Sequence, residues 1–147
     1  MGRHFEDFAV GTEYRTPGRT LTEADIVGFA GLTGDYNPLH TDEVFAAKSI
    51  FGGRIAHGPM MVGMAFGLLS RLDLIDGTVL ALKAIEWSFE APLKAGDTVH
   101  VLAEVVEAEP SRRHDDRGTV ALRIRIVRQD GVVAQTGRAV LIMARRG

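Results

Sequence analysis

The stretch that decides the fold of this chain is GPMMVGMAFGLLSRL, residues 58–72. It is the most apolar segment, and Gly58-Pro59 is a typical helix start because proline is favoured at the first helical position. The apolar run is too short to span a bilayer, and Arg71 and Asp73 close it. The segment therefore predicts a central helix, over about 59–72, that the rest of the chain packs around.

The second half of the chain predicts an antiparallel sheet. Its β-rich stretches are 78–91, 97–109, 118–128 and 132–144. Between Val120 and Val127 every second residue is a large aliphatic one, the period of a half-buried strand. Asp130-Gly131 is typical of a hairpin turn. Helices followed by an antiparallel sheet indicate an α+β fold.

The first half predicts two further helices. Thr22 suits the N-cap of a helix that Gly34 would end. Asn37-Pro38 combines an N-cap residue with proline at the first helical position, so a second short helix is expected through Ala47. Residues 5–20 are expected to form a lead-in loop and a short strand.

Composition indicates one domain over residues 1–147, with 46% hydrophobic and 24% charged residues. There is no cysteine, which excludes disulfides, zinc–thiolate sites and cysteine nucleophiles and suits a reducing cytoplasm. A net charge of −2 provides no electrostatic footprint for nucleic acid or an anionic membrane. We therefore expect a cytoplasmic protein with neither kind of partner.

Six arginines cluster late in the chain, interleaved with aspartates: Arg112, Arg113, Arg117, Arg123, Arg125 and Arg128. We interpret them as a solvated strand face and turn. The alternative is a patch for an anionic group such as a nucleotide phosphate.

The stretch GDYNPLH, residues 34–40, holds the candidate catalytic pair. The corner at Asn37-Pro38 would bring Asp35 and His40 to one side of a rigid turn. Early in a helix, His40 would be kept neutral by the positive helix end and could accept a proton from water. The residues alone leave open an inert turn with no activity.

A second candidate group is His57-Gly58, at the predicted start of the central helix. The backbone N–H of Gly58 would be unsatisfied there, and could hold a carbonyl oxygen that becomes negatively charged. A purely structural helix start remains an alternative, and His57 could line the site or lie in the core. Gly63 and Gly67 share a helix face, which suggests that a backbone, a sheet or a ligand passes close by.

Three blocks of the sequence resemble the MaoC-like dehydratases, or (R)-specific enoyl-CoA hydratases. The first is GDYNPLH at 34–40 with Ala46 six residues beyond, the second is Ile55–Gly58, and the third is 87–97, which ends in Gly96-Asp97. The blocks follow in the family's order over nearly the whole chain. The resemblance implies a single hot-dog domain, in which a long central helix is wrapped by an antiparallel sheet, and a homodimer or higher homo-oligomer.

The resemblance also implies an activity, the (R)-specific hydration of trans-2-enoyl-CoA to (R)-3-hydroxyacyl-CoA or the reverse dehydration. Asp35 and His40 would be catalytic and activate a water. Asn37, His57 and Gly58 would form the substrate-binding part, with Asn37 bracing the loop and the Gly58 N–H holding the thioester oxygen. Alternatives are a hot-dog acyl-CoA thioesterase and a non-catalytic acyl-CoA-binding module.

The same resemblance implies no metal and no cofactor, with coenzyme A present only as part of the substrate. His40-Thr41-Asp42 has no third ligand at a metal-site spacing. Some family members carry a small hydroxyl residue on the central helix, whereas this chain has GMAFG at 63–67, so Phe66 is expected to shorten or reshape the acyl tunnel. Arg54 and Lys94 are candidate contacts for the CoA phosphates.

Overall fold

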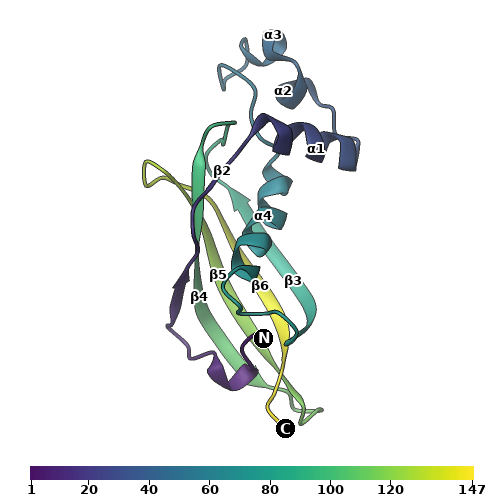
Figure 1. The fold of residues 1–147 in the computed structure, drawn as a ribbon, viewed down its shortest axis with the longest axis vertical. Coiled ribbons are helices and arrows are strands. Elements are labelled where there is room, and N and C mark those ends of the chain that lie inside the picture. The colour runs from purple at the N-terminus through teal and green to yellow at the C-terminus, as the bar shows by residue number, and fades with distance from the viewer.

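A computed structural model, which describes all residues 1–147, has helix α4 (Gly58–Ser70) lying along one face of a curved sheet (Figure 1). The strands are β1 (Glu13–Arg15), β2 (Arg19–Thr20), β3 (Val79–Phe89), β4 (Thr98–Pro110), β5 (Arg117–Arg128) and β6 (Val133–Ala144). Their order is β1-β4-β5-β6-β3, with β2 also paired to β4, and every pairing is antiparallel. The α+β prediction and the four long strands are confirmed, with strand ends within two residues of those expected.

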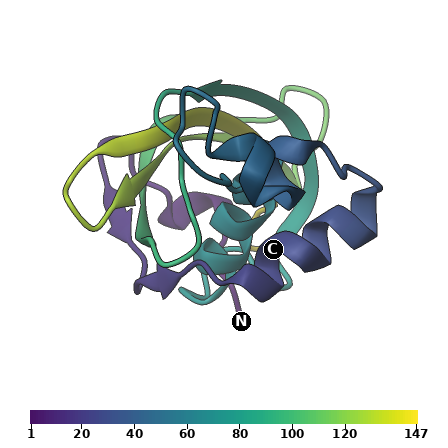
Figure 2. The same ribbon diagram turned by 90° about the horizontal axis from the view of Figure 1, so that it is seen from above.

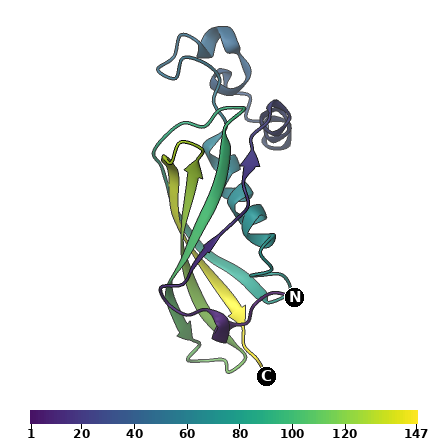
Figure 3. The same cartoon turned by 60° about the vertical axis from the view of Figure 1, so that its left-hand side comes forward.

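The core lies between α4 and the inner face of the sheet. Met61, Leu68 and Leu69 of α4 are each about 1–2% exposed. They belong to a cluster of 23 buried residues to which β4 and β5 contribute alternate positions, such as Val101 and Ile124. Figure 3 shows α4 on one face of the sheet and no element on the other. This one-sided packing explains the alternation of large aliphatic residues in the sequence.

The outer face of the sheet is charged and internally neutralised. The strand register places Glu104, Arg123, Arg138 and Glu86 in one row across β4, β5, β6 and β3. Arg123 pairs with Glu104 at 3.0 Å, and Arg138 pairs with Glu107 at 2.7 Å. Further ion pairs join Arg117 to Asp116, Arg125 to Glu13 and Arg128 to Asp130. The interpretation of the late arginines as a solvated strand face and turn is confirmed for these residues.

Residues 22–57 form a lobe that projects beyond one end of the sheet (Figures 1 and 3), which we call the site lobe. It holds α1 (Glu23–Thr33), α2 (Pro38–Thr41) and α3 (Glu43–Ala46). Thr22 caps α1 by accepting the N–H of Asp25, and Gly34 ends α1 with φ of +77°, as the sequence predicts. Seen from above, the lobe lies across the end of the curved sheet (Figure 2).

The single second helix expected from Asn37 to Ala47 is wrong, because the segment forms two four-residue helices. Asp42 leaves the helical region, with φ −122° and ψ 103°. Its carboxylate then accepts the N–H of Phe45 and caps α3, so an aspartate that competes for backbone donors splits the helix. The lead-in likewise contains a 3₁₀ turn, η1 (Phe5–Asp7), and two short strands where one was expected.

Gly63 and Gly67 face open space. Apart from the adjacent residues and the backbone of α4 itself, no atom of the chain lies within 4 Å of the position that a Cβ would occupy on either residue. The expectation that a backbone or the sheet of this chain passes close to them is therefore wrong. None of the helices combines the length and the apolar character needed to span a membrane.

Candidate active site

Asn37 braces both members of the predicted catalytic pair. Its N–H donates to the Asp35 carboxylate at 3.2 Å, and its carbonyl accepts the N–H of His40 at 2.9 Å. Its side-chain oxygen is used locally, because it caps α2 by accepting the N–H of Leu39 at 3.0 Å. The turn that the sequence predicted between Asp35 and His40 is thus built around one asparagine.

The orientation of the His40 ring is set by the segment that precedes α4. Its Nδ1 lies 2.8 Å from the carbonyl oxygen of Ile55. A carbonyl only accepts hydrogen bonds, so Nδ1 carries the proton, and Nε2 of the neutral ring keeps its lone pair. The sequence argument attributed the neutral form to a helix dipole, but α2 has only four residues. The carbonyl contact instead fixes the tautomer, and a neutral ring in that tautomer can accept a proton at Nε2.

His57 lies behind the pair, 1% exposed. Its Nε2 donates to the backbone carbonyl of Asp35 at 2.9 Å. Its ring stacks on His40 with centroids 3.9 Å apart and an interplanar angle of 26°, and Phe29 packs edge-on at 4.9 Å. One buried side chain therefore contacts both Asp35 and His40. The sequence left open whether His57 lines the site or lies in the core, and the structure places it in the core directly beneath the site.

Asp35, His40 and His57 converge. One ligand-type side-chain atom from each lies within 4.8 Å of the others. Two histidines and a carboxylate at such distances resemble a metal-binding set. The two rings, however, stack nearly parallel, and lone pairs that lie in nearly parallel ring planes do not meet at one ion. The cluster is better suited to proton transfer than to binding an ion through both imidazoles.

Gly58 is the first residue of α4, and its N–H has no acceptor within the chain. Glycine is required there because a Cβ would lie 2.8 Å from Cδ1 of Phe89. The preceding residues are fixed by backbone bonds, since the N–H of Ala56 donates to Leu93 at 2.7 Å and that of Ile55 to Leu39 at 3.1 Å. The segment that leads to this free donor at the helix start is therefore held in a defined place up to Ala56.

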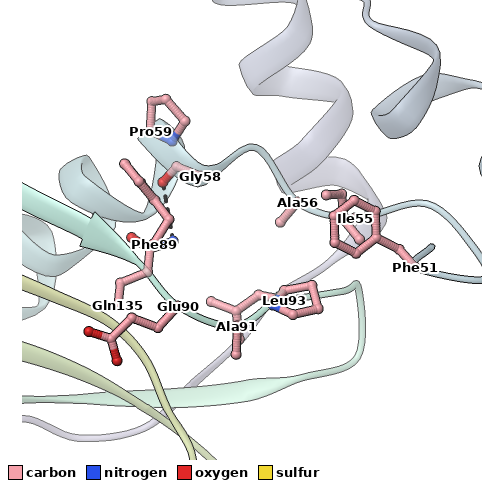
Figure 4. Close-up of a pocket in the computed structure, with 11 residues that line it drawn as sticks. Phe51, Ile55, Ala56, Gly58, Pro59, Phe89, Glu90, Ala91, Leu93 and Gln135 are labelled. Atoms are coloured by element: carbon pink, nitrogen blue, oxygen red, sulfur yellow. Dashed lines mark hydrogen bonds between the residues drawn. The ribbon is translucent and has the colours of Figure 1, made fainter. Parts of the chain in front are cut away.

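A cavity of about 300 Å³ opens beside Gly58 (Figure 4). Its walls are mainly apolar and consist of Phe51, Ile55, Ala56, Gly58, Pro59, Phe89, Glu90, Ala91, Pro92, Leu93 and Gln135. Asp35, His40 and His57 do not line it. The segment 55–58 separates the polar cluster from the cavity, because the Ile55 carbonyl accepts from His40 while Ile55 also lines the cavity wall. Phe66, expected to shape the acyl tunnel, is not part of this wall.

The two suggested phosphate contacts are occupied within the chain. Arg54 pairs with Glu43 at 2.7 Å and also with Glu23. The hydrogen bonds that Arg54 donates to Glu43 and, to a smaller extent, to Glu23 raise the pKa of its guanidinium. Lys94 donates to the carbonyl of Phe51 at 2.7 Å. Both cations therefore fasten the site lobe in this structure, and no free basic patch is formed by them.

Comparison with known proteins gives the family. Residues 6–126 match the model of the MaoC like domain. The chain belongs to this family. It is 41% identical over 111 residues to the 3-hydroxybutyryl-CoA dehydratase of Methylorubrum extorquens, covering 75% of this chain and 68% of that protein. It is 34% identical over 118 residues to the (R)-specific enoyl-CoA hydratase of Aeromonas caviae, covering 80% and 83%.

Solved structures agree with the fold. The MaoC-like dehydratase from Rhodospirillum rubrum superposes with a TM-score of 0.89 at 32% identity, over 99% of each chain. A Mycobacterium tuberculosis protein with a double hotdog fold, at 20% identity and a TM-score of 0.86, covers 99% of this chain and 45% of its own and shows the fold alone. The MaoC-like chain therefore has a hot-dog fold, as predicted, and is an enzyme of the hydratase/dehydratase type, a hydro-lyase.

Proposed function

We propose that this chain catalyses the (R)-specific hydration of trans-2-enoyl-CoA to (R)-3-hydroxyacyl-CoA, or the reverse dehydration. The observation that carries the proposal is the Ile55 carbonyl on Nδ1 of His40, which leaves Nε2 as a base in the same cluster as the Asp35 carboxylate. The named activities of the dehydratase and the hydratase relatives support the same substrate class.

In the proposed hydration, Asp35 and His40 hold one water between them. Nε2 of His40 takes a proton from the water as its oxygen bonds to the β-carbon of the enoyl thioester. The electron pair of the double bond moves toward the thioester oxygen, where the free N–H of Gly58 stabilises the developing enolate. The proton is then returned to the α-carbon, so that one water is added and nothing else is consumed. Dehydration uses the same groups in reverse.

Asn37 and His57 act in this proposal by positioning the pair, since each bonds to Asp35 and contacts His40. The chemistry moves protons only, so we propose that neither a metal nor a redox cofactor takes part. We also propose a cytoplasmic location, which the lack of cysteine favours.

The test is a spectrophotometric assay on a panel of trans-2-enoyl-CoAs of increasing chain length, coupled to an (R)-3-hydroxyacyl-CoA dehydrogenase, with free thiol measured in parallel. Reversible hydration without release of CoA is expected. Release of CoA without hydration would replace the proposal with a thioesterase. Binding of acyl-CoA with no turnover of any panel member would indicate a non-catalytic module.

We further propose that the functional unit is a homodimer formed through β3. This strand is an edge of the sheet and is exposed at most of its positions. Leu82 and Ile85 lie opposite Leu141 and Ala139, which are buried, yet they are 48% and 40% exposed. A long apolar edge strand is an aggregation hazard unless another chain pairs with it. A second copy of β3 is the partner that suits this edge.

Light scattering coupled to size exclusion tests the dimer. Wild type is expected to elute with twice the mass of one chain, and Ile85→Glu as a monomer. Val44→Glu is the control, because Val44 is 72% exposed on α3, away from the strand edge. A monomeric wild type, or a dimer that survives Ile85→Glu, would reject this interface.

A further inference from the structure

A buried glutamine on the last strand contacts the helix start that carries the free N–H. Gln135 of β6 is 3% exposed and lies in the wall of the cavity (Figure 4). Its Nε2 donates to the carbonyl of Gly58 at 3.3 Å, a bond drawn in Figure 4. Its Oε1 accepts the indole N–H of Trp87 at 2.8 Å. The three residues thus form a chain of hydrogen bonds from β3 through β6 to α4.

The direction of this chain is fixed by chemistry. An indole nitrogen only donates, so the amide oxygen of Gln135 must face Trp87 and the NH₂ group must face Gly58. A helix carbonyl only accepts, so the second bond has the matching polarity. The amide therefore has one workable orientation, and Trp87 selects it. A glutamate or a methionine at position 135 could not accept from the indole and also donate to Gly58.

Space for the Trp87 ring is provided by Gly137, a glycine in the interior of β6. Trp87 faces Gly137 in the β3–β6 register, and a Cβ on Gly137 would lie 1.9 Å from the indole ring. Glycine in a strand interior weakens the strand, so its presence there is explained by the close approach of the ring. Phe89 faces Gln135 in the same register and covers Gly58. Trp87 and Phe89, which share one face of β3, thus both support the start of α4.

Gly58 needs such support because it is glycine. Phe89 leaves no space for a Cβ, and a residue without Cβ has wide conformational freedom. Rotation about its backbone would redirect the N–H that the proposed reaction uses. The bond from Gln135 to the Gly58 carbonyl restrains this rotation from the side of the sheet.

We propose that Gln135, oriented by Trp87, is a positioning residue that aims the Gly58 N–H at the substrate oxygen. The assignment rests on the proposed function for its catalytic consequence, but the structural linkage can be tested without it. An interaction that matters when charge develops on the oxygen should lower kcat and kcat/KM together and leave KM unchanged.

The kinetic test uses Gln135→Met, which keeps the size of the side chain and removes both bonds, and Trp87→Phe, which keeps a ring over Gly137. Each should lower kcat roughly three- to tenfold, the effect of one lost neutral hydrogen bond. The double variant should be no slower than Gln135→Met alone, because the two bonds act in series. Thr16→Val is the control, since Thr16 is 4% exposed and also makes a buried side-chain bond, at 2.9 Å to Val101, on the opposite edge of the sheet.

The second measurement observes Gly58 directly. His57-Gly58 is the only histidine–glycine pair in the sequence, so labelling histidine carbonyls with ¹³C and glycine amides with ¹⁵N yields one correlated NMR signal. That signal should shift in Gln135→Met and in Trp87→Phe and stay in place in Thr16→Val. If wild type does not hydrate enoyl-CoA but the signal shifts as expected, the linkage stands and the proposed function fails. An unmoved signal, or a kcat loss in Thr16→Val as large as in Gln135→Met, would overturn the inference.

Discussion

In the site lobe, each group of the proposed site is fixed by hydrogen bonds to single atoms: Asp35 by Asn37 and His57, and His40 by Ile55. In β5, by contrast, Leu122, Ile124 and Ile126 are at most 1% exposed and belong to one packed cluster. Hydrogen bonds are individually modest in net stability, whereas buried aliphatic side chains contribute several kcal/mol each. Changes in the lobe should therefore alter catalysis with little effect on folding, and changes in β5 should do the opposite.

The largest effect is expected at the catalytic pair. Asp35→Asn and His40→Ala should each lower kcat by about 10²–10⁴-fold, because general acid–base groups typically contribute that much. Asp35 is exposed and His40 is half-buried, so thermal unfolding should change little in Asp35→Asn and only modestly in His40→Ala. The matched controls are Asp115→Asn and His114→Ala in the turn between β4 and β5. If Asp35→Asn and His40→Ala are folded and turn over at the wild-type rate, the proposed mechanism is wrong.

The reciprocal effect is expected in the sheet. Ile124 is fully buried in β5, and Ile124→Ala should lower the free energy of unfolding by about 2–5 kcal/mol through lost transfer energy and a cavity. Urea denaturation measures this loss, and kcat per folded molecule should stay near that of wild type. A tenfold drop in kcat with unchanged stability would show that the division between lobe and sheet is false.

His57 should behave as an intermediate case, because it is as buried as the core yet bonds to the site. His57→Leu removes the bond to Asp35 and the stacking on His40, and about tenfold in kcat should be lost. His57→Gln can place an N–H near the Asp35 carbonyl and should recover part of the rate. His100→Leu, in β4, provides the comparison. Equal losses in His57→Leu and His57→Gln would mean that packing alone is at stake.

The same contrast explains what the sequence could predict. Periodic burial in β5 and the apolar character of α4 are local patterns, so the four long strands and the central helix were predicted to within two residues. The turn around Asn37 was also predictable, because an N-cap and a proline act on their own neighbours. The split at Asp42 was missed, since a cap residue inside a helical pattern resembles a helix residue until its side chain is seen.

Contacts between distant segments were beyond such patterns. Nothing local indicates that Ile55 orients His40 or that Gln135 reaches Gly58, because these bonds span 15 and 77 residues. Gly137 was the one available signal for the second contact, as an unexplained glycine inside a strand suggests that a large group approaches the backbone. The position of Trp87 opposite it becomes apparent only with the register of β3 and β6.

The smallest effect, none at all, is expected from metal removal. Dialysis against a chelator should leave kcat unchanged, because the stacked rings of His40 and His57 do not direct their lone pairs to one point. Asp35 with only one of the two histidines would offer two ligands, fewer than the three or four protein ligands of a typical zinc site. Addition of Zn²⁺ to the dialysed enzyme is the control, and it should not raise the rate. Loss of activity on chelation and its recovery with metal would show that Asp35, His40 and His57 form a metal centre and not a proton-transfer cluster.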